Sequence, residues 1–203
     1  MSGGKRPQNG SRGAGNGART ETAMTEKDGN GKIRKCGEQD ILRTAAFYDR
    51  VVLYLDSHIN YPRWIRHVYP SERSVREMAE TGAQYVYARD EAIVGAFALN
   101  ADPQGAYREG KWKRSLPEGS YLVLHALAVD PDRQREGIGS EILRFAAGRA
   151  RSEGYRAVRA DIVPENLPVR RLFEMNGFTY AGDADLRRNI GDVPLFSLYE
   201  LNW

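Results

Sequence analysis

One segment of this sequence restricts the fold more than any other: an apolar run, then a loop with two glycines, then a helical pattern. Residues 121–129 are apolar except for His125, and such a run is typical of a strand in the centre of a sheet. Residues 131–139 begin with a proline, which ends the strand, and contain both glycines. Over 138–154 apolar residues recur at helical spacing up to a final glycine. The segment therefore predicts a β-α unit.

The loop of this unit has the composition of an anion site. Gly137 and Gly139 let the backbone pass close to a ligand and turn successive N–H groups inward, and the helix that follows adds the positive end of its dipole. A pyrophosphate fits such a loop. Ser140 and Glu141 give no G-x-G-x-x-G signature, and no G-x-x-x-x-G-K-[ST] occurs, which argues against dinucleotide and nucleoside triphosphate sites.

The rest of the chain from residue 32 onward alternates helical and strand patterns. In chain order these predict a short strand at 33–36, helices over 41–55 and 71–82, a hairpin of 83–89 and 92–100, a surface loop over 101–119, a strand at 157–162, a short helix over 168–176 and final strands at 178–181 and 195–201. Glu38, Gln39 and Asp40 offer an N-cap for the first helix. We expect a single domain over 32–203, because a 203-residue chain with 41% hydrophobic content can build one core.

Charge and cysteine content exclude several classes of protein. The 30 cationic side chains are balanced by 27 anionic ones in the same segments, which argues against nucleic acid as the main partner. Cys36 is the only cysteine, so an intrachain disulfide is excluded and a cytoplasmic location fits. No run approaches the roughly 18 apolar residues of a membrane span. His58 and His67 are not paired into a metal site.

Residues 1–31 contain almost no apolar side chains, so we expect them to form a disordered leader. Met24, just before the composition changes, is a candidate for the true start. The leader is interpreted either as a solvated tail or as a basic tether for RNA or anionic lipid.

Two motifs resemble those of the GNAT superfamily of acyl-CoA-dependent N-acyltransferases. Residues 134–139, Gln-x-x-Gly-x-Gly, match the superfamily's [QR]-x-x-G-x-[GA] loop and follow a strand, as they do in the family. Residues 166–178 are similar to the family's asparagine-containing helix with its Gly-Phe end. Two motifs in this order and at this separation are much more specific than either alone. The close resemblance covers residues 121–180, and the order of elements from 32 onward agrees more loosely.

The resemblance implies an α/β (α+β) fold with a mixed, strongly curved sheet of about six or seven strands and about four flanking helices. The fourth and fifth strands should splay apart, and acetyl-CoA should lie in that gap, with pantetheine along exposed strand backbone and pyrophosphate on the loop. The residues expected to bind acetyl-CoA (coenzyme A) are Leu127, Ala128, Val129, Gln134, Arg135, Glu136, Gly137, Ile138, Gly139, Ser140, Asn166, Arg170 and Phe173. Glu136 departs from the family, which often has a basic residue or glycine there, and its carboxylate is expected to point away from the phosphate.

Acyl transfer to an amine needs a neutral nitrogen, stabilisation of the oxygen on which charge develops, and a proton for the departing thiolate. His125, the sole polar side chain of the central strand, is the candidate base, because an unperturbed pKa of about 6.5 suits proton removal near neutrality. The alternative is a hydrogen-bonded core histidine. The resemblance implies a strand bulge within residues 126–128, whose backbone N–H would serve the oxygen.

The general acid is less well defined. Many family members have a tyrosine after the helical leucine, whereas this chain has Phe173, which cannot donate a proton. Tyr199 on the last strand is the candidate substitute, and water or the low basicity of the thiolate are alternatives. The alternative for Tyr199 is an ordinary strand aromatic. Cys36 lies far from the motifs and is expected to be a buried structural thiol.

The acceptor pocket is expected between the elbow of the first two helices and the 101–119 loop. Tyr61, Trp64 and Trp112 are candidate walls, with Tyr107 as a further one, because aromatic rings favour an amine by packing and cation–π contact. The alternative for each ring is an anchor of its loop to the core.

The sequence thus predicts an acetyl-CoA-dependent N-acetyltransferase that acts by direct attack of a primary amine, on a small molecule or a protein. A catalytically inactive CoA-binding sensor is the alternative. A homodimer is a family-level expectation, and neither nucleic acid nor a membrane is expected as a partner.

Overall fold

The computed structural model describes residues 1, 3, 31–188 and 190–203 of the chain. The predicted leader, residues 1–31, lies outside the described residues apart from Met1, Gly3 and Gly31, so its disorder stays a prediction. Gly31 already belongs to the first strand.

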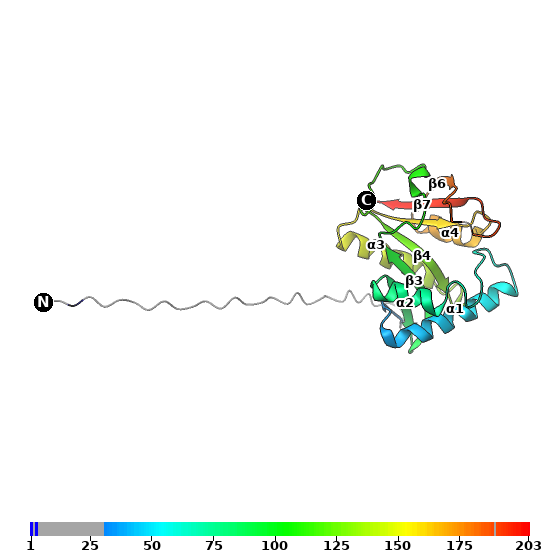
Figure 1. Ribbon diagram of the computed structural model, residues 1–203, viewed down its shortest axis with the longest axis horizontal. Helices are drawn as coiled ribbons and strands as arrows, with labels where there is room; N and C mark the ends of the chain where they lie inside the picture. The colour runs from blue at the N-terminus through cyan, green and yellow to red at the C-terminus, as the bar shows by residue number, and fades with distance from the viewer. Residues whose placement is uncertain (2, 4–30, 189) are drawn as a thin grey trace.

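The described part of the chain contains seven strands and four α-helices (Figure 1). In chain order they are β1 (Gly31–Lys35), α1 (Ile41–Asp56), α2 (Glu72–Glu80), β2 (Gln84–Arg89), β3 (Ala92–Asn100), β4 (Leu122–Val129), α3 (Ile138–Ser152), β5 (Ala157–Ile162), α4 (Leu167–Met175), β6 (Thr179–Ala184) and β7 (Phe196–Asn202). Every strand and helix expected from the sequence is present, with ends shifted by a few residues. None of the described helices combines the length and the apolar character that a bilayer crossing requires.

The strands form one mixed sheet in the order β1-β2-β3-β4-β5-β7-β6. Neighbouring strands are antiparallel except for β4 and β5, which are parallel because α3 carries the chain back across the sheet. The predicted α/β fold, with its mixed sheet and about four helices, is confirmed.

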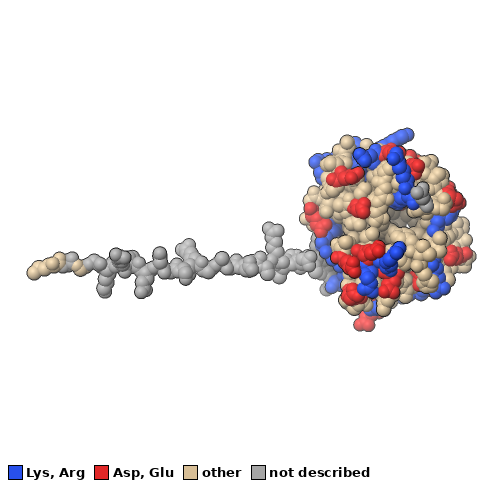
Figure 2. Space-filling model, viewed as in Figure 1, with Lys and Arg blue, Asp and Glu red and all other residues tan. Residues whose placement is uncertain are grey.

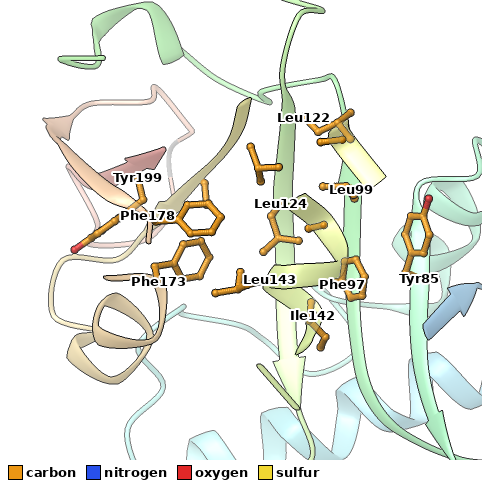
Figure 3. Packing of buried hydrophobic residues seen from close by; sticks show 14 of the residues in the cluster. Tyr85, Phe97, Leu99, Leu122, Leu124, Ile142, Leu143, Phe173, Phe178 and Tyr199 are labelled. Carbon is orange, nitrogen blue, oxygen red and sulfur yellow. The ribbon is translucent and has the colours of Figure 1, made fainter. Parts of the chain in front are cut away.

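The helices cover the two faces of the sheet separately. On one face, Ile142 and Leu143 of α3 pack with Leu124 of β4 and Phe97 of β3, and Phe173 of α4 joins the same cluster (Figure 3). α1 and α2 pack on the opposite face. β2 and β3 alternate their side chains between the two clusters, which is the pattern expected of a sheet buried on both faces.

The face that carries α1 and α2 continues across β5, β7 and β6, where loops cover it in place of helices. The 101–119 loop contributes Tyr107 and the segment after β6 contributes Leu186 to a third apolar cluster, which also contains Val123 and Leu198. This loop-covered half of the sheet lies directly beside the end of the β4–β5 pairing.

The side chain of Asp40 does not cap α1, contrary to the expectation from the sequence. Its carboxylate accepts hydrogen bonds from the backbone N–H of Gly37 at 3.0 Å and from a guanidinium N–H of Arg34 at 2.8 Å. These bonds fasten β1 to the start of α1. The hydrogen bonds from Arg34 hold the pKa of Asp40 below its usual value.

Candidate active site

The first feature of the site is the gap between β4 and β5. Parallel pairing joins Leu122–Leu124 to Val158–Ala160, and no later residue of β4 has a β5 partner within the described part of the chain. β5 continues along β7 as far as Ile162. The predicted splay of the fourth and fifth strands is confirmed, and the backbone of β4 beyond Leu124 is an open edge that an extended ligand can join.

A β-bulge interrupts β4 at this open edge. The register between β3 and β4 shifts between Ala96 and Ala98, so Ala126 and Leu127 together lie opposite one residue of β3. Ala126 has a φ of 49°, and its carbonyl accepts a hydrogen bond from the hydroxyl of Tyr48 on α1 at 2.8 Å. The bulge implied by the sequence resemblance is present, and its backbone N–H groups are candidates for holding an oxyanion.

The loop between β4 and α3 is built on left-handed backbone. Arg135 and Gly137 have φ values of 67° and 84°, and Gly137 is the N-cap of α3. The first N–H groups of α3 have no intrahelical partner and carry the positive end of the helix dipole. A Cβ on Gly139 would stand 2.8 Å from a methyl carbon of Leu172, so this glycine lets α3 begin close against α4. The geometry suits the diphosphate predicted from the sequence.

Asn176, which the sequence analysis missed, ties the end of α4 to the start of α3. Its side-chain amide donates to the hydroxyl of Ser140 at 2.9 Å and to the carbonyl of Leu172 at 2.8 Å. The asparagine of the Asn-Gly-Phe end of the second motif was the available signal.

Two acidic residues at the loop are held by β2. Arg89 pairs with Glu136 at 2.5 Å, and its Nη2 donates to the hydroxyl of Tyr87 at 3.3 Å. That hydroxyl in turn donates to Glu141 in the first turn of α3. The pairing with Arg89 agrees with the expectation that the carboxylate of Glu136 points away from a bound phosphate.

The predicted ligand-binding residues of α4 lie across the gap from β4. Asn166 is the N-cap of α4, and its Oδ1 accepts a backbone N–H of the first turn at 3.3 Å. Arg170 donates from Nε to the hydroxyl of Tyr199 at 3.0 Å. Phe173 is buried between Phe178 and Tyr199, so it supports the site by packing. Ligand contact by these residues stays a prediction.

His125 lies just before the bulge, on the face of the sheet covered by α1 and α2, and is 7% exposed. Its Nε2 lies 2.9 Å from the carbonyl oxygen of Asp102. Because a carbonyl only accepts, Nε2 of the neutral ring carries the hydrogen and Nδ1 carries the free lone pair. Burial lowers the pKa of His125 below its ordinary value of 6.5, against the opposing effect of Asp161. The ring is therefore unprotonated at neutral pH, as a base must be.

A charged pair beside His125 was missed in the sequence. Asp161 of β5 follows the last residue that pairs with β4, and Arg188 binds it through hydrogen bonds of 2.6 and 2.8 Å. The hydroxyl of Tyr107 donates to the same carboxylate at 2.6 Å. Arg188 also donates to two carbonyls of the 101–109 segment, so the pair joins two loops to β5. In the sequence, Asp161 is a single aspartate in a strand of alternating residues. Nothing in that pattern distinguishes it from an aspartate that faces solvent.

The structure does not bring Tyr199 and His125 together. His125 faces a small cavity under α1 and α2, whereas Tyr199 belongs to the cluster under α3 and α4. In Figure 3 the rings of Phe173 and Phe178 lie between Tyr199 and β4. The buried hydroxyl donates to Glu174 at 2.8 Å, and burial raises the pKa of Tyr199.

The predicted acceptor aromatics fall in two separate places. Trp64 packs edge-on against Tyr48, with 5.9 Å between ring centroids, and so lies beside the bulge, and Tyr61 lies half-buried on the same segment. Trp112 instead stacks on Tyr107 and lines a pocket of about 590 Å³ under the 101–119 loop. The structure therefore does not bring these rings into one pocket, and their contact with an acceptor stays a prediction.

A protein-family model for the acetyltransferase (GNAT) family matches residues 50–178 of this chain. Solved structures share its fold. An N-acetyltransferase from Staphylococcus aureus Mu50 has a TM-score of 0.62 at 19% identity, over 86% of this chain and 99% of that chain. A GNAT-family acetyltransferase from Streptococcus agalactiae has a TM-score of 0.69 at 17% identity, over 85% and 95%. A Salmonella typhimurium protein described as an acetyltransferase with its cofactor acetyl-CoA has a TM-score of 0.62 at 17% identity, over 86% and 94%.

Among curated proteins, a tRNA-acetylating toxin from Mycobacterium tuberculosis is 34% identical over 97 residues. The match covers 44% of this chain and 58% of the toxin, so the chain spans less than two thirds of that relative.

Proposed function

The chain belongs to the GNAT acetyltransferase family, and on that premise we propose that it transfers an acetyl group from acetyl-CoA to a primary amine. One observation carries the proposal: β4 parts from β5 next to a bulge, and its open edge leads to the N-terminus of α3. A pantetheine chain added along that edge would have its thioester near the bulge and its diphosphate at Gly137.

The residues around the gap fit such a ligand. Backbone of Leu127–Val129 is available to pair with pantetheine amides, and the N–H groups of residues 134–140 are available to the diphosphate. Glu136 is the single carboxylate among residues 134–140, and Arg89 pairs with it. Asn166 is the N-cap of α4, the helix that follows β5 in the chain.

In the proposed reaction, Nδ1 of His125 accepts a proton from the amine, whose nitrogen attacks the thioester carbonyl directly. A backbone N–H of the bulge donates to the carbonyl oxygen as charge develops on it. The C–S bond breaks, and the thiolate takes a proton from Tyr199 or from water. Tyr199 is the candidate from the sequence, with its hydroxyl held by Arg170 and Glu174 of α4. Because its ring is buried, water is the donor that needs no rearrangement of the core. Direct attack needs no nucleophilic cysteine, in keeping with the buried Cys36.

Two glycines at opposite ends of α3 provide a matched test of ligand binding. Gly137 and Gly154 both have a φ of 84°, and a Cβ on either would meet no heavy atom within 4 Å. Valine at either position should therefore cost a similar stability, about 1–2 kcal/mol for left-handed backbone. We expect G137V to weaken CoA binding at least about tenfold, measured by calorimetry, and G154V to bind like the unmodified protein. Equal affinities of the two variants would contradict the proposal.

Turnover separates the proposed enzyme from its alternative, an inactive CoA-binding sensor. The assay follows thiol release from acetyl-CoA over a panel of small primary amines and peptides. Product with any amine supports the transferase. CoA binding without product from any amine supports the sensor, and absence of binding rejects both.

A second candidate acceptor is an amine carried on tRNA, favoured by the identity shared with the tRNA-acetylating toxin. An aminoacyl ester provides such an amine, so aminoacylated tRNA joins the panel, with deacylated tRNA as its control. Figure 2 shows cationic and anionic side chains interspersed on the face it displays. Because tRNA binding favours an extended basic surface, and the chain carries 27 anionic side chains against 30 cationic ones, a small-molecule or protein amine stays the leading proposal.

A further inference from the structure

A second pocket lies apart from the gap between β4 and β5, under the 101–119 loop. Its volume is about 590 Å³, within the roughly 300–1,000 Å³ of small-ligand sites. The loop forms one side through residues that include Trp112 and Ser115. Tyr121, just before β4, and Arg159 of β5 form the other. Nothing in the proposed acetyl transfer uses this space.

Arg159 is a buried cation on the wall of this pocket, with an exposed fraction of 2%. Its guanidinium carbon lies 3.9 Å from the ring centroid of Trp112 and 4.1 Å from that of Tyr121. Rings packed in this way engage the faces of a guanidinium and leave its N–H edge for hydrogen bonds. Nη2 donates to the carbonyl of Arg114 at 3.0 Å, but Nε has no hydrogen-bond partner among the described residues.

The nearby carboxylate does not satisfy this edge. Oε2 of Glu200 forms an ion pair with Arg159 at 3.8 Å from Nη2, beyond hydrogen-bond reach, and has no hydrogen-bond partner among the described residues, while Oε1 accepts the backbone N–H of Lys113 at 2.6 Å. A buried polar group without a partner is costly, so a guanidinium edge left incomplete beside an open pocket favours an external acceptor. Burial also lowers the pKa of Arg159, the direction that an added anion would oppose.

We propose that this pocket binds a small planar carboxylate, whose oxygens accept hydrogen bonds from the edge of Arg159 and whose ring packs against the aromatic walls. A guanidinium favours a carboxylate because the two forks match in geometry. Tyr107 is a shared wall: its ring lines the pocket, and its hydroxyl binds Asp161 next to His125. Because this wall joins the pocket to the region of His125, the bound carboxylate is either a group of the acceptor amine or a separate ligand, and the experiments below distinguish the two.

Binding is tested on the full chain without CoA, so the result does not depend on the proposed function. The probe is benzoate, and its uncharged isostere benzamide is the control. We expect benzoate to bind at least about tenfold more tightly than benzamide by calorimetry. R159K keeps the buried charge but loses the planar set of N–H donors, and S115W fills the pocket from the loop side while Arg159 itself is retained. Each variant is expected to lose that preference while keeping a native thermal unfolding transition.

The location is checked by the Nε–H resonance of Arg159 in labelled protein, which benzoate should shift and benzamide should not. Equal binding of the two probes, or a benzoate affinity that neither variant changes, overturns the proposal and leaves ordered water as the occupant. If R159K does not fold, S115W alone decides.

The source of the carboxylate is resolved with two acceptors that differ in one group, benzylamine and 4-(aminomethyl)benzoate. This arm rests on the proposed function. If the pocket serves the acceptor, the acid has the higher kcat/KM, R159K removes that advantage, and benzoate competes with benzylamine. If the ligand is independent, benzoate binds without competition. Failure of all amines to react counts against the transferase and leaves the binding result standing.

Discussion

His125 has a fixed tautomer and a lowered pKa, and both follow from where it lies in β4. The carbonyl of Asp102 fixes the hydrogen on Nε2, so Nδ1 is the nitrogen that can take a proton. Burial disfavours the charged ring, so the neutral form persists below pH 6.5. A core histidine without a role would share the burial but would not set the rate of the reaction.

The acid limb of the pH profile tests the role of His125. A ring with a lowered pKa is neutral above that pKa, so kcat/KM expressed for neutral amine should be full at neutral pH and fall as the pH drops through a value below 6.5. H125Q should reduce kcat/KM by about 10²–10⁴-fold and abolish that limb. Steady-state kinetics from pH 5 to 9 provide the measurement. If H125Q kept the acidic limb of the pH profile, His125 would be a structural core residue and not the base.

At the scale of elements, β2 prepares the loop before α3 for an anion. Arg89 holds Glu136, and Tyr87 holds Glu141, so the two acidic side chains nearest the helix start are both engaged. The departure of Glu136 from the family motif is thus compensated by a residue of a different strand.

This compensation predicts a rescue. R89M should raise the dissociation constant of CoA about tenfold, because it releases a carboxylate beside the diphosphate, and E136Q in the R89M background should restore it. Pantetheine, which lacks the diphosphate, should bind the variants equally well. R149M is the matched control, since Arg149 forms a 2.5 Å pair with Glu153 at the other end of α3. If CoA affinity is not restored in the R89M/E136Q variant, the Arg89–Glu136 pair serves only to anchor the loop.

Elements and motif loops were predictable because each depends on local pattern. Buried strands and helices repeat their apolar residues at a fixed period, and Gly137 stands where left-handed backbone is needed. The partner of Asp40 was not predictable, since Arg34 competes for its carboxylate from β1. The path of the 101–119 loop, which takes Trp112 away from the bulge, likewise depends on Arg159 and Glu200 in distant strands.

At the scale of the whole molecule, the two faces of the sheet have different tasks. The face under α3 and α4 holds the apolar core that supports the loop, and the face under α1 and α2 holds the bulge and His125. β1, one of the two edge strands, pairs with β2 and is also linked to the start of α1 through Asp40.

The link through Asp40 predicts a pH dependence of stability. The pKa of Asp40 is lowered in the folded protein, so its contribution is present above its unfolded pKa and lost as the pH falls through the folded value. D40N should reduce the free energy of unfolding by about 1–3 kcal/mol at pH 7, and the difference should shrink toward pH 2. Denaturant unfolding across this range is the measurement. D192N, which removes an exposed pair with Arg63, should leave stability unchanged at every pH.

The hydroxyl of Tyr48 joins α1 to the backbone carbonyl of Ala126. An acceptor too wide for the space under α1 would push that helix outward and drag the bulge with it, spoiling the alignment of the reacting carbonyl. Oversized amines would then bind with a nearly unchanged KM but react with a lower kcat. The enzyme would thus select among amines of different width through kcat.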